Sequence, residues 1–150
     1  MPNEPSAPAE PTRLDKAHDG VIKAVAERLK TYKSTSRLAG DRVYLKDAVP
    51  PSPELPYLVL SKGRNHGNPD SVAATFAQLD FRVEGRDDHE AGVPLLAQAV
   101  QHALNGWTSK PALDHCVLAD TGTVESEDGY HARRDSFGAF YHDRPPADDA

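Results

Sequence analysis

The side chains best suited to chemistry in this chain are His115 and Cys116, the one adjacent pair of good metal ligands. Both lie in a strand-like run, where neighbouring residues point to opposite faces of a sheet, so they do not readily share one metal ion. The sequence has no C-x-x-C, H-x-x-x-H or H-E-x-x-H spacing. We therefore expect no metal site, and we interpret Cys116 as an inert core residue rather than a nucleophile.

Two further segments have the composition of a ligand site. The acidic run 84–92 offers hard oxygens to a cation, but it lacks EF-hand spacing and precedes a predicted helix, whose N-terminus favours negative side chains. The segment 62–71 has two glycines without the Lys-Ser/Thr of a phosphate-binding loop, and we expect a mobile surface loop there. No G-x-S-x-G motif occurs. We predict no catalytic residue and no cofactor; a small metal-binding enzyme built on His115, Cys116 and the acidic turn is the third-ranked hypothesis.

The composition indicates a single soluble domain. A chain of 150 residues with 38% hydrophobic residues suffices for one core. One cysteine excludes an internal disulfide framework. A formal net charge of -6 argues against a surface that grips phosphates, although it permits a surface past which DNA slides. We expect no membrane span, because no apolar run approaches roughly 20 residues, and no secretory signal at the N-terminus.

The two ends differ in composition from the middle. Four prolines with Ser, Ala and Glu predict a disordered N-terminal arm over residues 1–12. Residues 144–150 predict a flexible acidic tail. Between them, we expect a single α+β domain over residues 13–143.

Hydrophobic periodicity places the elements of this domain. Apolar residues at helical spacing predict helices over about 14–33 and 89–105. Strict alternation over 77–84 predicts a strand with one wet face, which is typical of an antiparallel sheet. Asp-Gly within 126–129, between two strand-like runs, predicts a closing hairpin. The expected fold class is α+β, with a mostly antiparallel sheet of four to five strands and two main helices packed on one face.

A proline-rich segment connects two further short strands and is the most distinctive stretch of the chain. Four prolines between residues 50 and 56 exclude a helix and stiffen the backbone toward an extended conformation, as in a scaffold or docking surface. Leu95 lies off the apolar stripe of its helix, and Phe76 lies on the polar side of its strand. The candidate subunit or tube contacts are Pro50, Pro51, Pro53, Leu55, Phe76, Leu95, Arg133 and Arg134.

The order of local motifs carries a resemblance. An amphipathic first helix is followed by D-R-V-Y, a proline loop into P-Y-L-V-L, the strand A-Q-L-D-F-R-V, the helix L-L-A-Q-A-V-Q-H-A-L-N-G-W and a hairpin with E-D-G before F-G-A-F-Y. In this order they resemble the tail terminator (tail completion) proteins of long-tailed, siphovirus-like phages and gene-transfer agents. The likeness covers roughly residues 14–141.

The resemblance implies a structural role without a catalytic centre or cofactor. It implies a homo-hexameric ring at the head-proximal end of the virion's tail, made in the host cytoplasm. The ring would cap the tail tube protein, end tube polymerisation and offer a surface to the head-tail connector or stopper, while DNA passes through the lumen without specific binding. A head-closure or neck adaptor, or a minor tail tube protein, is the alternative.

Overall fold

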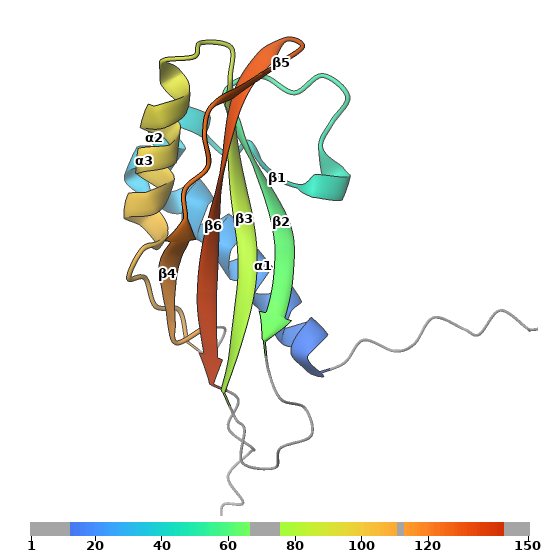
Figure 1. The fold of residues 1–150 in the computed structure, drawn as a ribbon, viewed down its shortest axis with the longest axis vertical. Helices are drawn as coiled ribbons and strands as arrows, with labels where there is room; N and C mark the ends of the chain where they lie inside the picture. The colour runs from blue at the N-terminus through green and yellow to red at the C-terminus, as the bar shows by residue number, and fades with distance from the viewer. Residues whose placement is uncertain (1–12, 67–75, 111–112, 143–150) are drawn as a thin grey trace, which may run out of the picture.

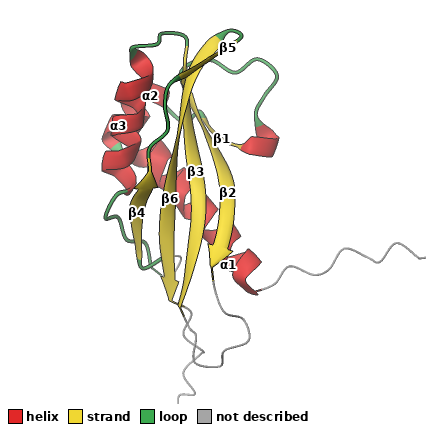
Figure 2. Cartoon of the chain, in the orientation of Figure 1, coloured by secondary structure: helices red, strands yellow, loops and turns green. Residues whose placement is uncertain are grey.

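The chain folds as a one-sided sheet with helices behind it (Figures 1 and 2). The structure is a computed structural model that describes residues 13–66, 76–110 and 113–142. In these described residues, three helices pack on one face of a six-stranded, mostly antiparallel sheet. The elements are α1 (Arg13–Thr31), α2 (Lys33–Ala39), β1 (Val43–Leu45), the 3-10 helix η1 (Lys46–Ala48), β2 (Tyr57–His66), β3 (Phe76–Asp87), α3 (Gly92–Leu104), β4 (His115–Asp120), β5 (Glu125–Glu127) and β6 (Tyr130–His142).

The expected α+β class is confirmed, with two differences in element number. The sheet has six strands where four to five were expected, because the stretch before the hairpin divides into β4 and the short β5. A third helix, α2, forms just where the helix predicted over residues 14–33 was expected to end. Its Thr35 is buried, and the hydroxyl donates to the carbonyl of Leu29 at 2.6 Å, so this polar residue is satisfied within the helical layer.

The strand order is β1-β2-β3-β6-β4, and β5 also pairs with β6. The long strands β3 and β6 pair antiparallel along their lengths, from Phe76 opposite His142 to Asp87 opposite His131. Among the described strand pairs, only β1 and β2 are parallel, and the proline-rich segment connects them. Because β3 occupies one side of β6, β4 and β5 share its other side.

The alternation along β3 separates a dry face from a wet one, as the sequence predicts. Leu79, Phe81 and Val83 are buried against the helices, whereas Arg82 is exposed on the opposite face, which we call the open face. Phe81 stacks on Phe137 of β6 with ring centroids 5.5 Å apart. The open face therefore remains available to other molecules.

Helix α1 supplies the largest apolar stripe of the helical layer. Val21, Val25 and Leu29 are fully buried at helical spacing. At its C-terminal end, Arg28 Nε donates to the carbonyl of Ala103 at 2.9 Å and so joins α1 to the end of α3. The described helices do not combine the length and apolar character that crossing a bilayer requires.

The loop expected over residues 62–71 is partly wrong. Strand β2 continues to His66 and pairs with β3, with a register shift between Lys62 and Asn65. Long antiparallel pairing with β3 overrides the local turn propensity of the glycine and asparagine there. Residues 67–71, the arm 1–12 and the tail 144–150 lie outside the described residues.

The closing hairpin is confirmed. Strands β5 and β6 flank Asp128 and Gly129, and Gly129 adopts a φ of 94°. A positive φ at this turn position suits glycine, because other residues meet steric strain there.

Candidate interaction surfaces

The residues that could do chemistry are placed apart. Cys116 is fully buried, and burial raises the pKa of its thiol to about 12, which suppresses the nucleophilic thiolate. His115 is exposed on the other face and stacks on Phe140, with ring centroids 4.6 Å apart. In the part of the chain that the structure describes, no group of three or more His, Cys, Asp or Glu side chains is placed to hold a metal ion.

The acidic run before α3 forms a turn rather than a helix cap. Asp87 Oδ1 accepts a hydrogen bond from the backbone N–H of His89 at 3.1 Å. Helix α3 begins only at Gly92, its N-cap is Ala91, and its first turn contains no acidic residue. The interpretation of these carboxylates as helix N-terminal partners is therefore only partly wrong. No side-chain hydrogen bond caps α3, which begins three residues after the expected start at His89. Asp87 nevertheless lies at its N-terminus, because a Cβ on Gly92 would be 2.2 Å from Asp87 Oδ2.

The proline-rich segment packs beside the tip of the closing hairpin. Pro50 and Pro51 are exposed, whereas Pro53 and Leu55 are half-buried. All four line a hollow of about 510 Å³ that also contains the tip residues 128–130. These four residues thus form a surface beside β5 and β6 at one end of the sheet, which we call the proline ledge.

The remaining predicted contact residues fall in separate places. Leu95 is 59% exposed on α3, on the helical side of the molecule. Phe76 begins β3, and its side chain lies outside those described. Arg133 Nε donates to the buried carboxylate of Asp135 at 2.9 Å, and Arg134 pairs with Glu84 on the open face at 3.2 Å. Among the predicted contact residues whose side chains are described, the structure therefore groups Pro50, Pro51, Pro53 and Leu55 into one surface.

Sequence reasoning missed the role of Arg86. Its Nη1 donates to the hydroxyl of Tyr57 at 2.9 Å, and its Nε pairs with Glu84 at 2.5 Å. The guanidinium carbon also lies 4.7 Å from the ring centroid of Tyr130. Burial opposes the charge, but these hydrogen bonds raise the pKa of Arg86 above its usual value. The alternation of charged residues along β3 was the available signal, because it places Arg82, Glu84 and Arg86 on one face.

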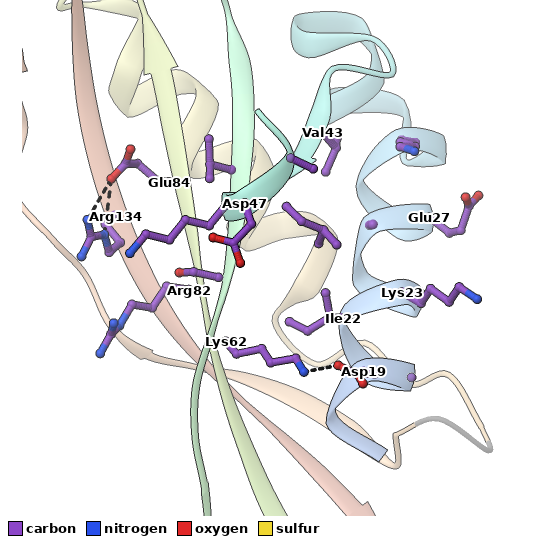
Figure 3. A pocket seen from close by; sticks show the side chains of 18 of the residues that line it. Asp19, Ile22, Lys23, Glu27, Val43, Asp47, Lys62, Arg82, Glu84 and Arg134 are labelled. Carbon is purple, nitrogen blue, oxygen red and sulfur yellow. Dashed lines mark hydrogen bonds and ion pairs between the residues drawn. The ribbon is translucent and has the colours of Figure 1, made fainter. Parts of the chain in front are cut away.

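A second missed feature is an open hollow where β1 ends beside α1, which we call the basic notch (Figure 3). Its volume is about 1160 Å³. Lys62 of β2 reaches across the gap to pair with Asp19 of α1, while Arg82 and Arg134 project from the sheet. The lining contains eight Lys and Arg side chains against four Asp and Glu, a surplus of four positive charges: Lys16, Lys23, Lys30, Lys46, Lys62, Arg82, Arg86 and Arg134 against Asp19, Glu27, Asp47 and Glu84.

Comparison with known proteins gives one family and one fold. A family model described as "Tail completion protein gp17" matches residues 23–142. A solved chain from a structure described as "Virion of native gene transfer agent (GTA) particle" is 24% identical with a TM-score of 0.64, and the match covers 84% of this chain and 98% of that chain. This likeness shows that the two chains share a fold. No curated protein matches the chain.

Proposed function

The chain belongs to the tail completion protein gp17 family, whose members are structural components of phage tails, and on that premise we propose that it forms the ring that ends the tail tube. The family resemblance expected from the sequence is confirmed, and the protein's place is the phage tail. The observation that carries the proposal is the extent of the match, which includes the C-terminal part of α1 and every strand from β1 to β6.

The proposed assembly is a homo-hexamer that sits between the tail tube protein and the head-tail connector or stopper. A closed ring of identical subunits needs two unlike surfaces on each subunit, which meet head to tail. The one-sided sheet supports this, because the described helices all pack on one side and leave its open face uncovered. The net charge of -6 suits a lumen through which DNA moves without being held.

The proposed role is mechanical, and no catalytic step is part of it. A substrate turned over by the purified chain, or a stoichiometric transition metal in it, would contradict this part of the proposal. We also propose that residues 13–143 form the single domain of the subunit, with residues 1–12 and 144–150 as extensions.

Deletion of the gene tests the role. Without a terminator the tube continues to polymerise, so electron micrographs of the mutant should show overlong tails. Full-length tails detached from heads would instead identify a head-closure or neck adaptor. Tails of normal length attached to heads would refute both roles.

We also propose that the contact residues predicted from the sequence meet the tube, the connector or neighbouring subunits. The ledge of Pro50, Pro51, Pro53 and Leu55 and the exposed Leu95 are the strongest of them, because these side chains reach solvent in the isolated subunit. Leu95→Asp should leave the free energy of unfolding nearly unchanged while reducing incorporation into tails. The matched control is Gln98→Asp, an exposed position on the same helix. Equal incorporation of both variants would show that Leu95 is not an interface residue. Phe76, Arg133 and Arg134 are tested in the same way.

A further inference from the structure

The basic notch concentrates positive charge in an acidic chain. Its surplus of four positive charges contrasts with the net charge of -6 for the whole sequence. Lys46 and Arg82 are exposed, and neither forms an ion pair with another described residue. Among the described residues, only Lys62, Arg86 and Arg134 have carboxylate partners within the notch. The notch therefore carries positive charge that is not balanced by carboxylates of the same subunit and can attract an acidic binding partner.

The floor and the size of the notch favour a polypeptide over a small molecule. Ile22, Val43 and Val59 line the notch but are buried, at most 7% exposed, so Leu45, which is 47% exposed, is the apolar side chain that reaches its surface. The volume of about 1160 Å³ exceeds the roughly 300–1,000 Å³ of typical small-ligand pockets. An apolar floor with a charged rim is also the general composition of a protein interface.

The β5–β6 hairpin has the complementary character. Between Lys110 and Arg133 the sequence contains five Asp and Glu residues and no Lys or Arg. Glu125, Glu127 and Asp128 are all exposed on this hairpin. The two glutamates share a hollow of about 460 Å³ with Arg86 and Arg134 of the same chain, but these carboxylates form no ion pair with a described residue.

The notch and the hairpin are distinct patches that share one border. Glu84, Arg86 and Arg134 line both the notch and the hollow that holds Glu125 and Glu127, whereas Lys46 lies in the part of the notch beside β1 and β2. Two unlike and complementary surfaces on one subunit are what a head-to-tail contact between identical subunits requires. A contact between identical patches would instead bring like charges together, which is unfavourable.

We propose that the basic notch of one subunit receives the acidic β5–β6 hairpin of the next copy in the ring. This inference rests on the proposed ring and names the side chains that close it. Glu125, Glu127 and Asp128 enter beside Lys46 and Arg82, while the apolar floor packs against the body of the hairpin. The contact is repeated around the ring and weakens as ionic strength rises.

Charge reversal in a strain that lacks its own copy of the gene tests the pairing. The notch variant Lys46→Glu/Arg82→Glu and the hairpin variant Glu125→Lys/Glu127→Lys should each lower incorporation of the chain into tails by more than about tenfold and give overlong tails. The combined variant restores opposite charges and should recover incorporation to within about twofold of the wild type. Incorporation is measured by quantitative immunoblotting of purified particles, and tail length by electron microscopy.

Matched controls separate specific pairing from net charge. Lys33→Glu/Lys110→Glu and Asp41→Lys/Glu90→Lys make the same charge changes at exposed positions outside the notch and hairpin. These controls should incorporate like the wild type. If they fail as severely as the notch and hairpin variants, or if those variants incorporate normally, the pairing is refuted.

Chemical crosslinking tests the contact between notch and hairpin in the wild-type protein, without any variant. In wild-type particles, a zero-length carboxylate-to-amine reagent should join the hairpin of one copy to Lys46 of another, seen as a covalent dimer with that crosslinked peptide. Dimers that lack this peptide would overturn the inference. Normal tails after gene deletion would instead refute the proposed function itself, so the two failures are distinguishable.

Discussion

The guanidinium of Arg86 lies over the ring of Tyr130, 4.7 Å from its centroid. Tyr130 begins β6 at the closing hairpin, whereas Arg86 lies near the end of β3. The same guanidinium bonds Tyr57, which follows the proline-rich segment. One side chain therefore joins the hairpin, the sheet and the proline ledge, and it fixes the direction in which the acidic hairpin projects.

Replacement of Arg86 should loosen this end of the sheet. Arg86→Leu removes the contacts with Tyr57, Tyr130 and Glu84 and should lower the free energy of unfolding by about 1–3 kcal/mol. Arg86→Lys should recover only part of this loss, because an ammonium does not reproduce the planar contacts. Urea unfolding followed by circular dichroism measures both. Arg37→Leu, at an exposed position of α2, is the control, and an equal effect of all three variants would contradict the assigned role.

Asp135 should be among the most sensitive polar positions. This carboxylate is 2% exposed and accepts hydrogen bonds from Gln101, the backbone of Gly122 and Arg133 at 2.9–3.0 Å. Asp135→Ala leaves these donors without their acceptor and should cost about 2–4 kcal/mol of unfolding free energy. Asp128→Ala, on the exposed hairpin tip, should cost less than about 0.5 kcal/mol. Similar unfolding midpoints for the two variants would refute the prediction.

Two glycines should respond in opposite directions to alanine. A Cβ at Gly122 would lie 2.2 Å from the carbonyl oxygen of Arg134, so Gly122→Ala forces the backbone apart and should destabilise the fold by about 1–3 kcal/mol. A Cβ at Gly20 in α1 meets nothing within 4 Å. Gly20→Ala should therefore stabilise the chain by about 0.5–1 kcal/mol through helix propensity. Thermal unfolding measures both, and shifts of the same sign would contradict the prediction.

Stability should fall in acid partly through His18. Its Nε2 donates to the carbonyl of Asp80 at 2.7 Å, and burial lowers the pKa of the imidazole below 6.5. The unfolded chain therefore binds a proton more readily than the folded chain between these two pKa values. The contribution of neutral His18 is fully present above about pH 6.5 and is lost as the pH falls through the lowered pKa.

The measurement compares the wild type with His18→Gln, in which a neutral amide replaces the imidazole. The unfolding free energy of the wild type should decrease more between pH 7.5 and pH 5 than that of the variant. The charged and titratable neighbours of His18, namely Asp19, Lys62 and Asp80, are present in both proteins and contribute equally. Parallel pH dependences would refute the assignment.

The thiol of Cys116 should be almost unreactive in the folded protein. Burial raises its pKa from 9.0 to about 12. Because the thiolate is the reactive form, a disulfide reagent at pH 8 should modify the native chain at least about a thousandfold more slowly than the chain in urea. Absorbance of the released thiol product follows the reaction. Rapid modification of the native protein would show that this part of the core opens frequently.

The elements with strong periodicity were predictable, and those formed by long-range pairing were not. The alternation along β3 and the helical stripe on α1 fix which side chains are buried, and both are confirmed. Helix α2 was missed because its Ser and Thr residues have weak helix propensity, and burial of Thr35 against the core overrides it. The extension of β2 to His66 depends on pairing with β3, which local sequence does not encode.

The interaction surfaces also divide into features that local sequence predicts and features that only the tertiary fold creates. The exposure of Leu95 and of the first two prolines followed from local patterns. The basic notch did not, because its lysines come from α1, η1 and β2, which only the tertiary fold brings together. The ties of Arg86 to Tyr57 and Tyr130 likewise join residues 29 or more positions apart in the sequence.

The central place of β6 has a consequence during synthesis on the ribosome. It is the last described strand in chain order, yet it lies between β3 and the pair β4 and β5. A nascent chain that still lacks β6 leaves the apolar side of β3 without a neighbour on that side, where Phe137 would otherwise cover Phe81. The sheet therefore cannot close until β6 has been synthesised, and we expect products truncated before β6 to be substrates for chaperones and proteases.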